Sequence, residues 1–327
     1  MIFITGCNGL AGSFLARELV SKGETIRALK RPDSDMSLLG TCAQKIEWVE
    51  GDICDVTILD EALKGVNQVI HTAAIVSYLP QDREKMYKVN VEGTANVVNA
   101  AIRNSVQKFC QLSSVSAFGK NAKENIVSET VKLTNAEFSS FYGYTKFLAE
   151  LEIFRGIEEG LDAFMVNPSV IIGPGDWNKS STKLFRYVRE EKPFYTKGKM
   201  NYIDVRDVTS IIIQLMTQTN ITGEKFILNA GSISYKDFFE LIAKSLNKRP
   251  PRYQANAFLS EIAWRFSAIK STITGKPPLI SKETARLSGN SHLYDNAKIK
   301  NRLNYSFRDI KDSINWTCHQ LLEKKEK

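Results

Sequence analysis

The chain has 327 residues, of which 43% are hydrophobic and 24% are charged, proportions that are ordinary for a globular enzyme. This length exceeds the size at which one hydrophobic core usually stops growing, so we expect two lobes. No apolar run approaches the roughly 18 residues that a membrane-spanning helix needs. Because an apolar strand begins at residue 2, we expect no signal or transit peptide and a cytoplasmic location.

The net formal charge of +8 is unevenly distributed along the sequence. Residues 251–327 contain 14 Lys and Arg against 7 Asp and Glu, a local excess of 14 − 7 = +7. A solvated basic face is the simplest interpretation, and an anionic substrate or weak association with a membrane surface is the alternative. We expect no nucleic-acid binding, because the basic residues are scattered and no binding motif accompanies them.

The five cysteines are odd in number and none forms a C-x-x-C pair. We therefore expect reduced, mostly buried thiols rather than a disulfide or zinc framework. Cys7 lies inside the first glycine-rich loop, where packing is a simpler role than a redox switch. The sequence has only three histidines, so we expect no histidine-based metal site.

The chain begins with an apolar strand, Ile2 to Thr5, which three glycines follow at G-x-x-G-x-x-G spacing. A helical pattern then runs to Lys22-Gly23, and this order of strand, glycine turn and helix is typical of dinucleotide binding. Gly6 allows the tight turn, Gly9 lets the backbone approach the pyrophosphate, and Gly12 lets helix and strand pack closely. The free N–H groups of the first helical turn face the phosphate. We expect Asn8 and Leu10, in the same loop, to contact the cofactor too.

Strands and helices continue to alternate through the first half of the sequence. We expect strands over 24–29, 45–50, 68–72, 107–113 and 161–166, and helices over 56–64, 83–104 and 142–159. Such alternation indicates an α/β fold, a doubly wound parallel sheet of the Rossmann type. We assign residues 1–167 to this NAD(P)-binding domain.

The alternation ends beyond Asn167, and we assign residues 168–327 to a smaller, mostly helical substrate-binding lobe. Helical patterns cover 235–246 and 257–272, and short strands near 202–205 and 225–229 are candidates to return to the first domain. The 257–272 segment is amphipathic and basic, so it could lie on a membrane. We favour a helix that covers the core of its own lobe.

Tyr142 and Lys146 lie four residues apart on a predicted helix, so their side chains project from the same face. An unperturbed phenol has a pKa of about 10. A neighbouring ammonium favours the phenolate, and a nicotinium cation adds to this effect. We expect Lys146 and the nicotinium together to lower the pKa of Tyr142 by ~3 units, or roughly 4 kcal/mol. Tyr144 is not expected to take part, because it points elsewhere on the helix.

A serine-rich segment, residues 112–119, follows the fifth predicted strand. Ligands of open α/β sheets bind beyond the carboxyl ends of the strands. The hydroxyl of Ser114 is placed there to hydrogen-bond a substrate carbonyl and to share the proton of Tyr142. Ser113 and Ser116 are expected only to cap the loop.

Together these motifs resemble the extended short-chain dehydrogenase/reductase family, in particular its dihydroflavonol-reductase and 3β-hydroxysteroid-dehydrogenase branch. The resemblance covers residues 1–240 and rests on the glycine loop, on Asp52-Ile53, on Ser114 and on Tyr142-x-x-x-Lys146. Two further motifs match, Asn167-Pro168-Ser169 with its Gly-Pro-Gly turn and the segment 202–208.

The resemblance implies that Ser114 orients the carbonyl, that Tyr142 is the acid/base, and that Lys146 tunes Tyr142 and binds the nicotinamide ribose. It also implies further cofactor-binding residues: Asp52 and Ile53 at the adenine, Thr72, Ala73 and Ala74 along the cofactor path, Asn90 at a position used in proton relay, and Asn167 and Ser169. His71 is expected to pack at a strand end rather than act as a base. The family often forms homodimers by pairing the helices that correspond here to 83–104 and 142–159.

One departure from the usual pattern concerns the choice of cofactor. NAD-binding proteins usually carry an Asp or Glu after the second strand, where it binds the ribose 2′-hydroxyl. Here the strand ends at Lys30-Arg31, and the first carboxylate is Asp33. Because Arg31 can form two parallel hydrogen bonds to a 2′-phosphate, we expect NADP, with NAD as the alternative.

Three functions are compatible with these residues. The first is an NADP-dependent oxidoreductase that transfers a hydride between the nicotinamide and a carbonyl or secondary alcohol of a small molecule. The second is a nucleotide-sugar epimerase, and the third is a non-catalytic NAD(P)-sensing protein. A dehydratase would carry an Asp-Glu pair after the strand-end Ser or Thr, whereas Val115 and Ser116 follow Ser114 here. Tyr78 and Trp177 are candidates, with Ser114, for the wall of the substrate pocket.

Overall fold

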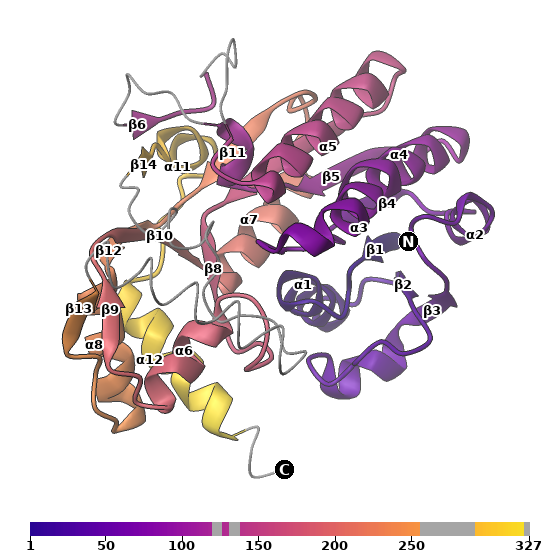
Figure 1. Ribbon diagram of the computed structural model, residues 1–327. Coiled ribbons are helices and arrows are strands. Elements are labelled where there is room, and N and C mark those ends of the chain that lie inside the picture. The colour runs from indigo at the N-terminus through magenta and orange to yellow at the C-terminus, as the bar shows by residue number, and fades with distance from the viewer. Residues whose placement is uncertain (120–125, 131–137, 256–291, 324–327) are drawn as a thin grey trace.

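A seven-stranded, wholly parallel sheet forms the centre of the molecule (Figure 1). The computed structural model describes residues 1–119, 126–130, 138–255 and 292–323. The strand order β11-β7-β5-β4-β1-β2-β3 confirms the predicted Rossmann-type sheet. The strands are β1 (Ile2–Thr5), β2 (Ile26–Lys30), β3 (Glu47–Glu50), β4 (Gln68–His71), β5 (Lys108–Leu112), β7 (Ala163–Pro168) and β11 (Lys225–Leu228).

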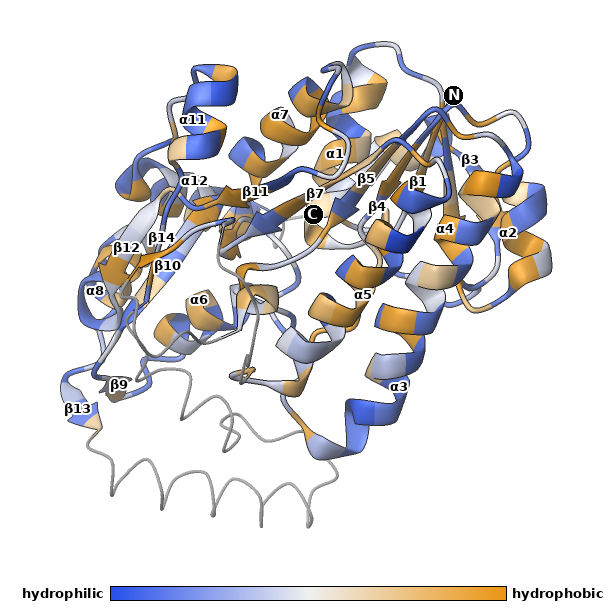
Figure 2. Cartoon of the chain, turned by 90° about the horizontal axis from the view of Figure 1, so that it is seen from above, coloured by the Kyte–Doolittle hydropathy of each residue, from blue (hydrophilic) through white to orange (hydrophobic). Residues whose placement is uncertain are grey.

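Helices cover both faces of this sheet, which explains why strands such as β1 and β7 are buried along their whole length. Alternate residues of each strand face opposite helix layers: Ile4 packs in the core formed with α1 (Leu10–Ser21) and α7 (Val205–Met216). Phe3 packs in the core formed with α2 (Val56–Ala62), α4 (Gly93–Arg103) and α5 (Phe141–Glu158). Figure 2 shows the apolar strands between these layers. In open α/β sheets of this kind, ligands bind beyond the carboxyl ends of the strands.

The helix predicted over 83–104 is divided into three parts. It comprises α3 (Arg83–Tyr87), one π-helical turn (Lys88–Glu92) and α4. A π-helical turn has one extra residue within a helix and frequently lies at a functional site. Asn90 lies in the middle of this turn and is buried.

The second lobe combines helices with small sheets. Strands β8 (Val170–Ile172), β10 (Lys199–Asp204) and β12 (Gly231–Ser234) form one sheet, and β9 (Phe194–Thr196) pairs with β13 (Tyr253–Ala255). Helices α6 (Thr182–Arg189), α8 (Tyr235–Leu246) and α12 (Ile310–Glu323) pack with them around a separate core. A short β6 (Ile126–Val127) pairs with β14 (Leu293–Tyr294), and α11 (Ala297–Leu303) follows.

Of the two strands considered as returning to the first domain, only one does so. Lys225–Leu228 extends the large sheet as β11, by pairing with β7. The predicted return of 202–205 is wrong, because this segment belongs to β10, which pairs with β8 and β12. The helix predicted over 257–272 lies outside the described residues. Within the described ranges, no helix is both long and apolar enough to cross a membrane.

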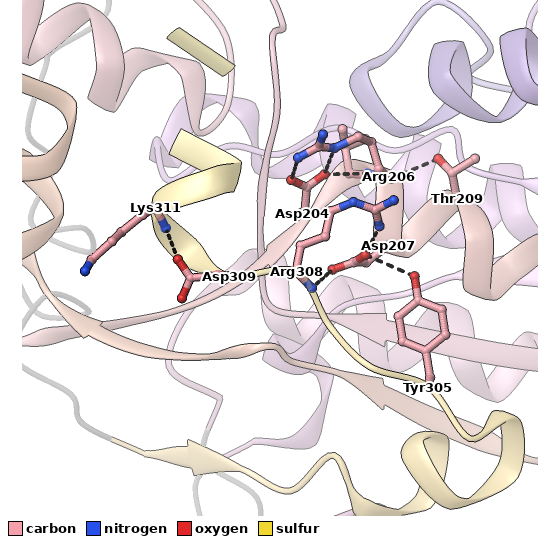
Figure 3. Close-up of polar contacts among 9 residues, drawn as sticks. Asp204, Arg206, Asp207, Thr209, Tyr305, Arg308, Asp309 and Lys311 are labelled. Carbon is pink, nitrogen blue, oxygen red and sulfur yellow. Dashed lines mark hydrogen bonds and ion pairs between the residues drawn. The ribbon is translucent and has the colours of Figure 1, made fainter. Parts of the chain in front are cut away.

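A buried carboxylate attaches the C-terminal segment to α7 (Figure 3). The side chain of Asp207 is fully buried and forms an ion pair with the guanidinium of Arg308. It also accepts hydrogen bonds from the backbone N–H of Arg308 and from the hydroxyl of Tyr305, both at 3.0 Å. These contacts fix the segment that leads into α12.

A second contact links α12 to the first helix of the chain. Asp204 caps α7 by accepting from the backbone N–H of Arg206 at 2.8 Å, and it also pairs with the guanidinium of Arg206. That guanidinium lies 3.8 Å from the ring centroid of Trp316 in α12, a cation–π contact. The edge of Trp316 meets Phe14 of α1, with the ring centroids 5.7 Å apart. The second lobe is thus held against the helix that follows the glycine loop.

Candidate active site

The glycine loop is shaped by close backbone approaches. Gly6 has φ of +66°, and a Cβ placed on it would lie 2.7 Å from the amide nitrogen of Ala73. A Cβ on Gly12 would lie 2.3 Å from the carbonyl oxygen of Gly6. Gly9 is the N-cap of α1, and no side chain caps this helix and no acid lies in its first turn. The N–H groups of this turn are therefore suited to an anionic pyrophosphate.

A chain of hydrogen bonds through His71 holds β1 and β4 together beside this loop. The Nδ1 of His71 lies 2.5 Å from the hydroxyl of Thr5, and its Nε2 lies 3.0 Å from the hydroxyl of Thr94. Because Thr94 donates its own proton to the carbonyl of Asn90, the ring must carry its proton on Nε2 and accept at Nδ1. Burial, with the nearby charge of Lys146, lowers the pKa of His71 to about 3. His71 is thus a neutral structural residue, not a base.

The residues after β4 are positioned by backbone contacts. Thr72 donates from its hydroxyl to the carbonyl of Thr5 at 2.7 Å, and the N–H of Ala73 donates to the hydroxyl of Thr5 at 3.2 Å. The backbone of Thr72 and Ala73 lies against Gly6 of the glycine loop, and the half-buried Ala74 follows. This segment therefore borders the path that we assign to the cofactor.

Asn90 uses its whole amide group to hold protein elements in place. Its Oδ1 accepts from the N–H of Ile75 at 2.8 Å, and its Nδ2 donates to the carbonyl of Ile75 and to the hydroxyl of Thr145, both at 3.0 Å. Thr145 lies on α5, directly before Lys146. Asn90 thus joins the segment after β4 to α5, and its role at the cofactor stays a prediction.

A cavity of about 600 Å³ lies beyond the carboxyl ends of β2 and β3. It is lined by Arg31, Pro32, Asp33, Gly51, Asp52, Asp55 and Ile58. Ile53 is buried under Gly93. Lys30 is directed to Glu50, with its Nζ 3.9 Å from the carboxylate. Of the two basic residues that end β2, only Arg31 lines the cavity.

Tyr142 and Ser114 are brought together by the packing of α5 against the turn after β5. Ser114 caps the 3₁₀ turn Val115–Phe118 by accepting from the N–H of Ser116. A Cβ on Gly143 would lie 2.5 Å from the carbonyl oxygen of Ser116, so this close approach requires glycine. Tyr142 is consequently 9% exposed, and its hydroxyl is hydrogen-bonded to that of Ser114.

The electrostatics of this pair differ from our expectation. We predicted that Lys146 lowers the pKa of Tyr142, but burial, together with the neighbouring Tyr78, raises the pKa above its ordinary value, and the hydrogen bond from Ser114 opposes this only in part. The ammonium of Lys146 donates instead to the carbonyl of Leu112, at 2.7 Å. Burial lowers the pKa of Lys146 to about 8, against the opposing effect of Glu150. In this protein environment Tyr142 keeps its proton at neutral pH, as a proton donor must.

Glu150 is a buried acid that our reading of the sequence missed. It is 1% exposed, and its carboxylate accepts from the hydroxyl of Ser113 at 2.5 Å and from the Nδ2 of Asn167 at 2.6 Å. It also forms an ion pair with Lys225 of β11, at 2.5 Å. The spacing was a usable signal, because Tyr142, Lys146 and Glu150 follow one another at steps of four on one helix. Ser113, expected only to cap a loop, is one of its partners.

The remaining predicted residues lie in different surroundings. The ring of Tyr78 meets that of Tyr142 edge-on, with the centroids 6.3 Å apart. Trp177 packs against the core of the second lobe. The guanidinium of Arg189 lies 4.7 Å from the ring centroid of Trp177. Ser169 donates to the carbonyl of Leu228 at 3.3 Å, which joins β7 to β11. Leu10 faces the turn at Gly173 and Gly175.

The sequence model of the NAD-dependent epimerase/dehydratase family matches residues 2–231. The chain belongs to this family. The predicted resemblance to extended short-chain dehydrogenases/reductases is thereby confirmed, and the chain is an NAD(P)-dependent enzyme of this family. The bare first turn of α1 and the close backbone approaches of Gly6 and Gly12 fit the dinucleotide that the family implies.

Individual relatives cover most of the chain. A Synechocystis sp. protein named after dihydroflavonol 4-reductase is 29% identical, over 96% of this chain and 93% of its own. Sterol demethylase protein B of Methylococcus capsulatus is 31% identical, over 76% of this chain and 75% of its own. Among solved structures, gox2253 is 30% identical with a TM-score of 0.82, over 99% of this chain and 98% of its own.

Proposed function

We propose that this family member is an NADPH-dependent carbonyl reductase for a small, unphosphorylated and fairly apolar substrate. The observation that carries the proposal is the buried pair of Tyr142 and Ser114, in which Tyr142 holds its proton at neutral pH. A nicotinamide dinucleotide supplies the hydride when it is bound. Ser114 orients the substrate carbonyl through its hydroxyl, and Tyr142 donates the proton to the carbonyl oxygen. Lys146 supplies a positive charge behind Tyr142.

Two features favour reduction over the other reactions of the family. Val115 is apolar and Ser116 is not an acid, so the position after Ser114 offers no acid/base pair for a dehydration. The aromatic edge of Tyr78 beside Tyr142 suits an apolar substrate better than a nucleotide sugar. The Synechocystis relative is named after a reductase, which agrees with this choice.

NADP is the proposed cofactor because of the cavity beyond β2 and β3. Arg31 lines this cavity, and within the described part of the chain its guanidinium forms no ion pair with an acid. An unpaired guanidinium at the end of the second strand can bind a 2′-phosphate through two hydrogen bonds. Asp33 also lines the cavity, which keeps NAD as the alternative.

We also propose a cytoplasmic homodimer. Three apolar side chains on α5 are substantially exposed, Tyr144 at 39%, Leu151 at 44% and Phe154 at 37%. Their spacing of seven and three residues puts them along one stripe of the helix, as at a helix–helix interface. Covering this stripe with the same helix of a second copy would remove it from water.

A substrate screen tests the proposed function. Purified protein is incubated with NADPH or NADH and with ketones, aldehydes or nucleotide sugars, and both cofactor oxidation and product are measured. We expect NADPH consumption with a ketone or an aldehyde. Epimerisation of a nucleotide sugar without net NADPH consumption would refute the proposal, and tight cofactor binding without any turnover would favour a sensing protein.

A further inference from the structure

Glu150 is an anion placed inside the protein, one helical turn after the proposed catalytic Lys146 on α5. Its exposed fraction is 1%, so it has little access to water. A carboxylate in such a place is costly unless hydrogen bonds and an opposite charge compensate it. Ser113, Asn167 and Lys225 supply that compensation.

The first connection of Glu150 is to the end of β5. Lys146 and Glu150 lie one helical turn apart and bind consecutive residues at the end of this strand. Lys146 donates to the carbonyl of Leu112, the last residue of β5, and Glu150 accepts from the hydroxyl of Ser113, the next residue. Asn167 donates both to Glu150 and, at 3.0 Å, to the carbonyl of Ser114. The Glu150 carboxylate is therefore connected directly to the side chain of Ser113 and, through Asn167, to the backbone carbonyl of Ser114.

The second connection is electrostatic. Glu150 raises the pKa of Lys146, while burial lowers it. The other ionisable groups around Lys146 are weak sources of charge: His71 is neutral, and burial keeps Tyr142 protonated, with Tyr78 beside it. Lys225 forms an ion pair with Glu150 at 2.5 Å, and its Nζ lies 4.4 Å from the ring centroid of Phe118. It offsets part of the negative charge that Lys146 experiences.

We propose that Glu150 is a positioning residue of the proposed reductase site: its carboxylate fixes the Ser113–Ser114 strand end and lies one helical turn from Lys146, while Lys225 acts as its counter-ion. This inference rests on the proposed function. It gives β11, the last strand of the large sheet, a part in the chemistry at the end of β5.

The proposal predicts shifts of opposite sign from the two members of the ion pair. Replacing Glu150 by Gln removes the negative charge, so Lys146 loses its proton at lower pH. Replacing Lys225 by Gln leaves the charge of Glu150 less compensated, so Lys146 keeps its proton to higher pH. The double variant removes both charges and should fall between the wild type and Glu150→Gln. We expect about one pH unit for Glu150→Gln, the low end for an adjacent opposite charge.

Two quantities are measured as a function of pH: the NADPH affinity, by fluorescence titration, and kcat/KM with the carbonyl substrate found in the screen. The result compared between variants is the alkaline limb of each profile, the pH range over which the quantity falls. Glu152→Gln is the matched control, because Glu152 lies two residues further on α5 and pairs with Arg155 at the surface. Its limb should coincide with that of the wild type. If Glu150→Gln does not fold, Lys225→Gln and the double variant still test the predicted order.

Limbs that coincide with the wild type in folded Glu150→Gln and Lys225→Gln, or that move in the same direction, would overturn the proposal. A loss of thermal stability alone, with unmoved limbs, would show a purely structural ion pair and overturn it too. If the wild type reduces no carbonyl, the proposed function fails, but the NADPH-affinity profile still tests Glu150 independently.

Discussion

Replacing Tyr142 by Phe tests the proposed proton donor with little disturbance of the fold. The ring remains, with its edge contact to Tyr78, and only the hydroxyl that is hydrogen-bonded to Ser114 is lost. One hydrogen bond corresponds to about 1 kcal/mol of unfolding free energy. Turnover should fall by at least ~100-fold, or about 2.7 kcal/mol in the barrier, because the transferable proton is gone.

The pH dependence of the wild-type reduction rate gives a second quantitative prediction. Carbonyl reduction needs Tyr142 protonated and Lys146 in its ammonium form, so loss of either proton lowers the rate as pH rises. The pKa of Lys146, at about 8, is the lower of the two, since burial raises that of Tyr142. The rate should therefore be level below this pKa. One pH unit above it, only about a tenth of the molecules keep the Lys146 proton, and the rate should fall accordingly.

The assay is the initial rate of NADPH oxidation across pH, with cofactor affinity measured separately by fluorescence. Tyr144→Phe is the control, because this side chain is 39% exposed and its ring packs against Phe138 and Phe141. It should retain wild-type turnover. Turnover of Tyr142→Phe above about a tenth of the wild-type value would remove Tyr142 from the role of proton donor.

Four further changes test other parts of the molecule. Arg31→Asp should shift the relative affinity from NADPH toward NADH by about 1.5–3 kcal/mol, measured by titration with both cofactors; equal affinities in the wild type would contradict this. Gly12→Ala should weaken NADPH binding by at least about tenfold, because its Cβ would lie 2.3 Å from the carbonyl oxygen of Gly6; calorimetric titration measures the loss. Asp207→Asn should lower the free energy of unfolding by about 3 kcal/mol, because the buried charge of the ion pair with Arg308 is removed. Asp60→Asn removes an acid from a surface ion pair and should lower it by less than about 1 kcal/mol. Urea titrations measure both. Leu151→Glu should yield a monomer by light scattering where the wild type is a dimer, and a monomeric wild type would overturn the proposed interface.

The sequence predicted the large sheet well because its strands are buried on both faces and alternate with helices. Helix 235–246 and the strand at 68–71 appear where their apolar patterns placed them, within a residue. The small sheets of the second lobe were not predicted, since strands such as Val170–Ile172 are too short to show a period and follow a strand of the other sheet directly. The π-helical turn at 88–92 was also missed, because its residues have the same apolar pattern as an unbroken helix.

For the candidate site, the spacing of residues along the sequence was informative, but the three-dimensional environment of those residues could not be predicted from it. Tyr142 and Lys146 were found from a step of four residues, but the direction of the pKa shift of Tyr142 depends on burial by segments far away in the sequence. Glu150 could have been found from the same step, whereas its counter-ion Lys225, 75 residues further on, could not. A charge pair between a helix and a distant strand has no signature in a single sequence.

The ion pair between Asp207 and Arg308 also bears on how the protein is made. The two residues are 101 positions apart, so a ribosome delivers α7 long before the cation that neutralises its buried carboxylate. Until Arg308 emerges, drawing Asp207 into the interior would leave an uncompensated charge there. We therefore expect the nascent α7 to stay loosely attached, so that the face of the sheet that carries Ile4 is covered by α1 but not yet by α7. We expect the growing polypeptide to need chaperone protection of this apolar face until residue 308 has been synthesised.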